Sequence, residues 1–112
     1  MNIQIFGIPK CFDTKKAQRY FKERKIKFQF VDLLEKGLSK GELDSIEAAV
    51  GLEKLINKEI KDYERLNLSK IGSSTIKKEI LLKNPKLYNT PIVRNGKQAT
   101  VGYTPDVWET WE

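Results

Sequence analysis

The sequence contains no histidine and only one cysteine, Cys11, among its 112 residues. Without histidine, a catalytic Ser-His or Cys-His pair is excluded, and a transition-metal site is not expected. Without a second cysteine, no internal disulfide can form, which is typical of proteins in a reducing compartment. We therefore expect a cytoplasmic protein whose thiol chemistry depends on this single residue.

Long apolar stretches are also lacking. No run approaches the roughly 20 residues that a membrane-spanning helix needs. The N-terminus reads as a strand and has neither the basic start nor the cleavage site of a signal peptide. Hydrophobic residues make up 39% of the chain, which is enough for a modest core. Length and composition together predict a single domain over residues 1–112, without membrane association.

Basic residues outnumber acidic ones, and the formal net charge is +6. Such an excess suits an anionic partner. The lysines occur along the whole chain, however, and we therefore favour a solvated surface over a dedicated face for nucleic acid. We expect a monomer that does not bind nucleic acid directly.

The first 32 residues predict a strand, a helix and a second strand. Residues 3–6 are mostly apolar, and Asp13 or Thr14 can cap a helix that runs to about Lys25. Residues 27–32 alternate and are rich in aromatic and branched side chains, which favours a strand. This order within about 30 residues indicates two parallel strands joined by a crossover helix.

The middle of the chain, residues 38–85, is predicted to be an all-helical insertion. Ser39 and Glu42 have the spacing of a capping box, and Gly51 is a suitable C-cap for the helix that they open. Two further helices are expected, over residues 52–65 and 73–83.

After the insertion, two extended runs flank Asn95-Gly96, a strong hairpin signal. A last helix is expected over residues 105–111, with Thr104 as its N-cap. Trp108 and Trp111 are three residues apart on this helix and are expected to pack it onto the sheet. The fold class is therefore α/β: a mixed sheet built from a βαβ unit and a C-terminal β-hairpin and helix, with an all-helical insertion.

Cys11 lies in the loop before the first helix, where free N–H groups and nearby lysines favour a thiolate. An isolated cysteine is often a small buried hydrophobic residue instead, but its place at the helix N-terminus favours a reactive thiol. A single thiol cannot resolve its own mixed disulfide. Turnover therefore needs an external thiol, such as glutathione, a thioredoxin or a glutaredoxin, and no bound cofactor is expected. The substrate would be a thiol or disulfide on a small molecule or a protein.

Three segments of the sequence, residues 6–17, 89–93 and 101–103, carry a specific resemblance. The chain resembles the ArsC/Spx family of glutaredoxin-linked arsenate reductases and their relatives over nearly its whole length. The resemblance implies a thioredoxin-like fold and a cis peptide bond between Thr90 and Pro91 beside the cysteine. With Cys11 as nucleophile, the residues expected to stabilise its thiolate or bind substrate are Lys10, Phe12, Thr14, Lys15, Thr90 and Pro91.

The sequence departs from the arsenate reductases of this family at the arginines that bind the oxyanion. The corresponding positions hold Thr90, Asn57 and a residue near Tyr103, and none of these side chains supplies a guanidinium. The remaining candidate cations for this role are Lys15, Lys58 and Arg94. We therefore expect a thiol-dependent oxidoreductase rather than an arsenate reductase.

The resemblance also allows an Spx-type regulator that binds RNA polymerase without catalysis. Gly51 matches a glycine that this branch uses against the polymerase, although a helix C-cap explains the same residue. Thr14 stands where Spx proteins usually carry a second cysteine, which excludes a switch by internal disulfide.

Overall fold

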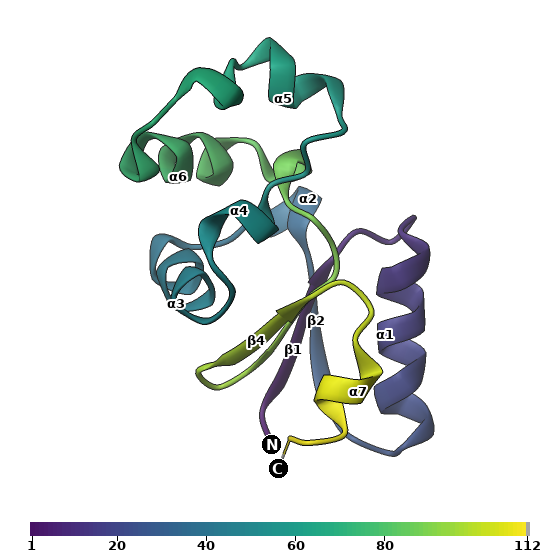
Figure 1. Ribbon diagram of the computed structural model, residues 1–112. Helices are drawn as coiled ribbons and strands as arrows, with labels where there is room; N and C mark the ends of the chain where they lie inside the picture. The colour runs from purple at the N-terminus through teal and green to yellow at the C-terminus, as the bar shows by residue number, and fades with distance from the viewer. Residues whose placement is uncertain (112) are drawn as a thin grey trace.

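The computed structural model describes residues 1–111 and contains one four-stranded sheet (Figure 1). The strands lie in the order β2-β1-β3-β4. β1 is parallel to β2, whereas β3 is antiparallel to both β1 and β4. The strand bounds are β1 (Ile3–Gly7), β2 (Phe28–Asp32), β3 (Ile92–Asn95) and β4 (Gln98–Val101). The predicted βαβ unit, hairpin and thioredoxin-like class of fold are confirmed.

Helices α1 (Phe12–Glu23) and α7 (Pro105–Trp108) cover one face of the sheet (Figure 1). The core beneath them contains both tryptophans, as expected from their spacing, and Trp108 is only 2% exposed. Burying these large side chains is the main stabilisation on this face. The buried residues of the cluster are Ile3, Ile5, Ala17, Tyr20, Phe21, Val93, Trp108 and Trp111.

The opposite face is covered by the insertion, whose first long helix, α3, packs against β4. A second buried cluster joins the insertion to the sheet through Phe6 of β1 and Ile92 of β3. In residues 1–111, no helix is long and apolar enough to cross a bilayer. The helices after β2 are α2 (Leu33–Lys36), α3 (Lys40–Val50), α4 (Leu52–Leu55), α5 (Lys61–Arg65) and α6 (Ser74–Lys83), with 3₁₀ turns at Leu68–Lys70 and Pro85–Leu87.

The predicted capping box opens α3. The Glu42 N–H donates to Ser39 Oγ at 3.1 Å, and the Ser39 N–H donates to Glu42 Oε1 at 2.9 Å. These two bonds satisfy N–H groups that the helix itself leaves free. At the other end, the Gly51 N–H donates to the Glu47 carbonyl at 2.8 Å. Gly51 has a φ of +87° and is therefore the expected C-cap glycine.

The helix predicted over residues 52–65 is wrong in its middle. α4 ends at Leu55 and α5 begins at Lys61, because the intervening backbone pairs with a distant segment. Ile56 forms an antiparallel bridge with Tyr88, and the Asn57 N–H donates to the Leu87 carbonyl at 2.7 Å. These non-local bonds replace the ones that a continuous helix would make.

Other boundaries shift by a few residues. The hairpin loop is Gly96-Lys97, so that Asn95 pairs with Gln98 at the ends of the strands instead of lying in the turn. α7 ends at Trp108, three residues before the predicted end. Thr104 holds the N-cap position, but its hydroxyl makes no capping hydrogen bond. The short helix α2, capped by the side chain of Asp32, was not predicted.

Candidate functional site

Cys11 occupies the N-cap position of α1, directly after the loop that follows β1. The prediction that Asp13 or Thr14 caps this helix is therefore wrong. The Cys11 N–H donates to the Ile8 carbonyl at 2.9 Å, and the Cys11 carbonyl accepts from the Lys15 N–H at 3.1 Å. These two bonds fix the backbone on both sides of the cysteine. Its thiol then takes the place that a capping oxygen normally occupies at a helix N-terminus.

Thr90 brings a second segment of the chain to the sulfur. Its hydroxyl donates to Cys11 Sγ at 3.2 Å, and its backbone carbonyl lies 3.8 Å from the same sulfur. The Thr90-Pro91 peptide bond is cis, as the family resemblance implies. The site therefore joins two segments that are 79 residues apart in the sequence.

Thr14 lies one helical turn after Cys11 and is completely buried. Within residues 1–111 its hydroxyl oxygen is buried and makes no hydrogen bond. A hydroxyl can rotate, so this one is free to donate to a Cys11 thiolate. A buried hydroxyl without a partner is costly, and ionisation of the sulfur supplies the missing acceptor.

Gly7, at the end of β1, allows this threonine to lie so close to the strand. A Cβ atom at position 7 would lie 2.5 Å from Thr14 Cγ2 and 2.6 Å from its Oγ1. Such distances are too short for any side chain, including alanine. Gly7 was not predicted as a site residue, because the requirement for glycine arises from a contact between two elements and not from a local pattern.

Burial raises the pKa of the Cys11 thiol, and four hydrogen-bond donors outweigh that effect. The donors are the hydroxyls of Thr14 and Thr90 and the backbone N–H groups of Thr14 and Asp13. The pKa of Cys11 consequently lies below its ordinary value. Each donor makes a stronger hydrogen bond to the thiolate than to the neutral thiol, and therefore stabilises the charged form of the sulfur. A larger fraction of Cys11 is therefore thiolate at neutral pH than in an unfolded chain.

The lysines expected to stabilise the thiolate lie around the site but are not among these donors. Lys10 and Lys15 are both exposed. The Nζ of Lys15 lies 5.7 Å from the centre of the Phe12 ring, and Phe12 itself is 78% exposed. The direct contacts with the sulfur are therefore made by hydroxyls and backbone amides, and the charge of these lysines is not among the causes that lower its pKa.

The positions where the family resemblance implies oxyanion-binding arginines have other contacts. Asn57 Oδ1 accepts from the Glu59 N–H at 3.0 Å, in the turn before α5. The Tyr103 ring packs edge-to-face against Trp108, with 5.5 Å between ring centres. Together with Thr90, these residues offer no planar cation that could hold an oxyanion at two points.

Two of the three substitute cations are engaged elsewhere. Arg94 donates to Gln4 Oε1 at 3.3 Å and to Ser45 Oγ at 3.2 Å, which ties β3 to β1 and α3. The Nζ of Lys58 lies 3.8 Å from a carboxylate oxygen of Glu53. Only Lys15 remains beside Cys11. In residues 1–111, no three metal-ligating side chains gather at one place.

Replacing Thr90 by valine is expected to raise the pKa of Cys11 and to slow its alkylation at neutral pH by about three- to tenfold. The change removes one hydrogen bond to a charged acceptor and keeps the side-chain volume. The measurement is the rate of iodoacetamide alkylation across pH. Thr110→Val, which changes an exposed threonine in the turn after α7, is the control. Equal pH profiles for Thr90→Val and the unmodified protein would contradict the role given to this hydroxyl.

Comparison with known proteins places this geometry in a family. The profile of the ArsC family matches residues 6–111. "Global transcriptional regulator Spx 2" of Oceanobacillus iheyensis is 29% identical over 110 residues, which cover 95% of this chain and 80% of that protein. YusI of Bacillus subtilis is 26% identical over 114 residues and is covered to 97%, as is this chain. The structure of an arsenate reductase from Vibrio cholerae superposes with a TM-score of 0.87 at 27% identity, covering 99% of this chain and 98% of that one. The chain belongs to the ArsC family.

Proposed function

We propose that this protein is a thiol-dependent oxidoreductase in which Cys11 is the nucleophile and an external thiol completes the cycle. The observation that carries the proposal is the set of two hydroxyls and two backbone N–H groups directed at one half-buried sulfur. That arrangement stabilises a thiolate, which is the reactive form in thiol–disulfide exchange. The arsenate reductase from Vibrio cholerae is a redox relative of similar length.

The proposed reaction has two exchange steps. The Cys11 thiolate attacks one sulfur of a substrate disulfide, and the bond to the other sulfur breaks. That second sulfur leaves as a thiolate with the electron pair and takes a proton from solvent. A thiolate of glutathione, a thioredoxin or a glutaredoxin then attacks the mixed disulfide on Cys11. This second step releases the Cys11 thiolate and joins the substrate sulfur to the external one.

The external thiol is required because Thr14 occupies the place of a second cysteine one turn along α1. Arsenate is not the proposed substrate, because the site offers threonine, asparagine and tyrosine where arginines would grip an oxyanion. The proposed substrate is a disulfide, which needs no anion-binding fork.

The test is to mix the reduced protein with a glutathionylated peptide and follow the products by mass spectrometry. We expect a mixed disulfide on Cys11 within the mixing time and its removal when glutathione or glutaredoxin is added. A parallel sample with arsenate and the same thiols should give no reduction above the background. If an excess of the mixed-disulfide peptide leaves Cys11 unmodified at neutral pH, the proposal is wrong.

The second candidate function is binding to RNA polymerase, since relatives named as Spx transcriptional regulators cover 93–95% of this chain at 26–29% identity. Gly51 is exposed, and a Cβ atom there would meet nothing within 4 Å. The open surface around it is compatible with a partner. Its φ of +87° explains the glycine without one, however, and the candidate therefore ranks second.

A further inference from the structure

The segment of residues 10–27 is strongly basic. Residues 10–27 contain eight lysines and arginines and two acidic residues, whereas the rest of the sequence contains thirteen of each kind. This segment, which runs from the loop before α1 to the residue before β2, therefore has a net charge of +6. Residues 65–97 are also basic, with eight lysines and arginines and one acidic residue, but two lysines of that stretch, Lys77 and Lys78, form ion pairs.

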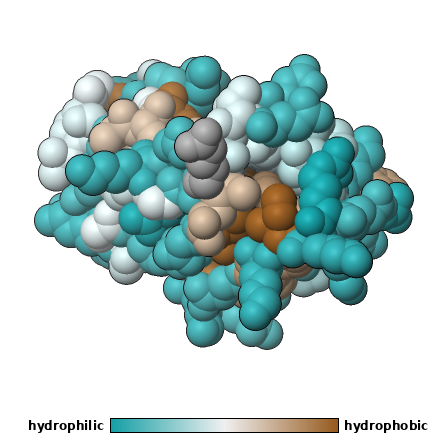
Figure 2. Space-filling view, turned by 90° about the horizontal axis from the view of Figure 1, so that it is seen from below, coloured by the Kyte–Doolittle hydropathy of each residue, from teal (hydrophilic) through white to brown (hydrophobic). Residues whose placement is uncertain are grey.

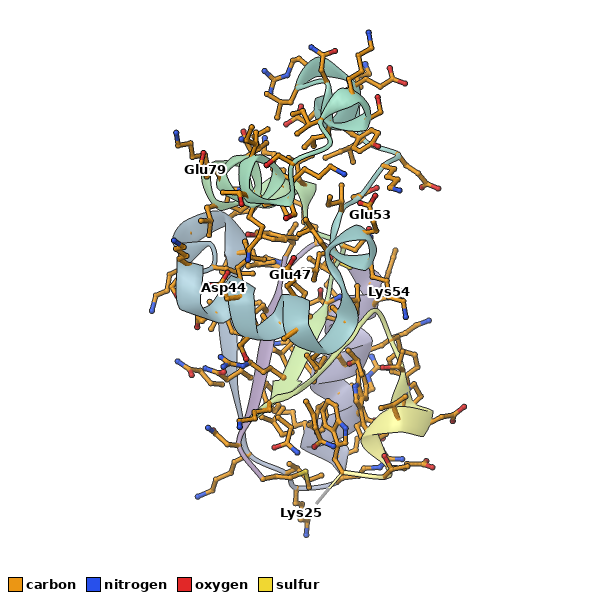
Figure 3. The ribbon with its side chains drawn as sticks, turned by 60° about the vertical axis from the view of Figure 1, so that its left-hand side comes forward. Lys25, Asp44, Glu47, Glu53, Lys54 and Glu79 are labelled. Carbon is orange, nitrogen blue, oxygen red and sulfur yellow. The ribbon has the colours of Figure 1, made fainter. Side chains whose placement is uncertain are left out.

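The ion pairs of residues 1–111 lie in the insertion, away from this segment. Lys58 and Lys77 pair with Glu53, and Lys78 bridges Asp44 and Glu47. Figure 3 shows these labelled acidic residues on the insertion and Lys25 at the opposite end of the molecule. The cations of residues 10–27 form no such pair in the described part of the chain, and their charge is available to a partner.

A groove beside α1 is lined by several of these cations, with one carboxylate, Glu23, among them. Its volume is about 440 Å³, and Lys15, Arg19 and Lys22 line it at helical spacing together with Phe28 of β2. A second groove adjoins it, sharing Lys22 and Phe28 and adding Lys25, Ile26 and Lys27. Figure 2 shows a hydrophobic patch bordered by hydrophilic side chains at the end of the molecule where the termini lie.

β2 is the outermost strand on this side of the sheet and pairs only with β1 in the described residues. Alternate backbone N–H and C=O groups along its outer edge therefore have no strand partner. The strand itself, Phe28–Asp32, contains neither lysine nor proline, the residues that commonly protect an edge from pairing. α1 packs close to it, since the ring centres of Phe21 and Phe28 are 6.4 Å apart.

We propose that β2 and α1 together bind an extended acidic peptide as an added strand. The peptide backbone would pair with the outer edge of β2, and its carboxylates would lie along Lys15, Arg19 and Lys22. An extended peptide beside an edge strand is a known mode of recognition, in which main-chain hydrogen bonds supply the affinity and side chains the selectivity. This inference does not rest on the chemistry of Cys11.

The positive charge of this surface also determines which kind of partner can bind to the edge of β2. A second copy of this chain pairing through β2 would bring two segments of net charge +6 together, and like charges across an interface oppose association. A single-stranded nucleic acid matches the charge but does not use the hydrogen-bonding edge of a strand. An acidic peptide satisfies both features of the surface.

The test uses a fluorescent peptide of alternating valine and glutamate, with binding followed by fluorescence anisotropy. The double variant Arg19→Glu/Lys22→Glu is expected to bind at least about tenfold more weakly. The matched control is Lys83→Glu/Lys86→Glu, which changes the net charge equally at exposed positions in the last turn of α6 and in the 3₁₀ turn that follows. It is expected to stay within about twofold of the unmodified protein. Equal weakening by both double variants would overturn the proposal, because it would indicate attraction to overall charge alone.

Two further samples test the added strand. The same peptide with N-methyl groups on alternate amides is expected to lose at least about tenfold in affinity, because one of its hydrogen-bonding edges is blocked. Undiminished binding of the methylated peptide would exclude strand addition. Tighter binding of a single-stranded oligonucleotide with the same number of charges would assign the surface to nucleic acid. Self-association of the free protein that the peptide reverses would assign it to a second copy, and either result overturns the proposal.

Discussion

Cys11→Ser is expected to abolish thiol–disulfide exchange, lowering its rate by at least about 1,000-fold. A serine hydroxyl stays protonated at neutral pH and cannot form a mixed disulfide, so neither exchange step is available to it. The fold should be retained, since the side chain is only partly buried and serine suits a helix N-cap. The measurement is the transfer of glutathione from the glutathionylated peptide, with circular dichroism to confirm folding.

The matched control carries its single cysteine at a different position of the chain. Cys11→Ser combined with Glu79→Cys again has a single thiol, now exposed in the middle of α6 and away from any helix N-terminus and from the Thr14 and Thr90 hydroxyls. We expect this variant to exchange disulfides no faster than an unfolded peptide thiol. If it matched the unmodified protein, the environment of Cys11 would have no part in the chemistry.

The single variant Cys11→Ser also separates the two candidate functions. Disulfide exchange by the unmodified protein that disappears in Cys11→Ser supports the oxidoreductase. Copurification with RNA polymerase that survives in Cys11→Ser, together with no exchange by the unmodified protein, would support the regulator instead. The two readouts are independent, since one follows a covalent step and the other an interface.

Trp108→Ala is expected to lower the free energy of unfolding by about 3–5 kcal/mol, the usual range for removing a large buried aromatic side chain. Trp108 contacts three aromatic rings, with centre-to-centre distances of 5.1 Å to Tyr20, 5.1 Å to Phe21 and 5.5 Å to Tyr103. Its Nε1 also donates to Thr100 Oγ1 at 2.8 Å. The substitution leaves both a cavity and a buried hydroxyl without its partner.

Urea unfolding measures this loss, and the neighbouring residue on α7 provides the control. Val107 is 43% exposed, and Val107→Ala should change the free energy of unfolding by no more than about 0.5 kcal/mol. A loss below about 1 kcal/mol for Trp108→Ala would show that α7 contributes little to the fold.

Several of the features predicted correctly from the sequence are determined by neighbouring residues. The capping box at Ser39, the C-cap at Gly51 and the helix–strand alternation at the N-terminus depend on side chains a few positions apart. The break between α4 and α5 could not be predicted in this way. It depends on the bridge between Ile56 and Tyr88, which are too far apart in the sequence to form a local pattern.

The candidate site shows the same division. The position of Cys11 at a helix N-terminus follows from local sequence, and so did the expectation of a lowered pKa. The expected causes were the free N–H groups of the helix N-terminus and the charge of nearby lysines, and the backbone N–H groups of Asp13 and Thr14 do lower the pKa of Cys11. The actual donors include Thr90, which reaches the sulfur only through the folded chain, and Thr14, whose closeness depends on Gly7.

The nature of those donors has a consequence for how the protein responds to its ionic surroundings. The Cys11 thiolate is stabilised by hydroxyl and amide dipoles in direct contact with it, and mobile ions do not enter such contacts. Attraction between separated charges is different, since the screening length in physiological salt is only about 8 Å. An increase in salt concentration should therefore leave the reactivity of the thiol unchanged and weaken the binding of an acidic peptide to α1 and β2. Thiol reactivity and peptide binding thus depend on physically separate interactions in the same small region of the fold.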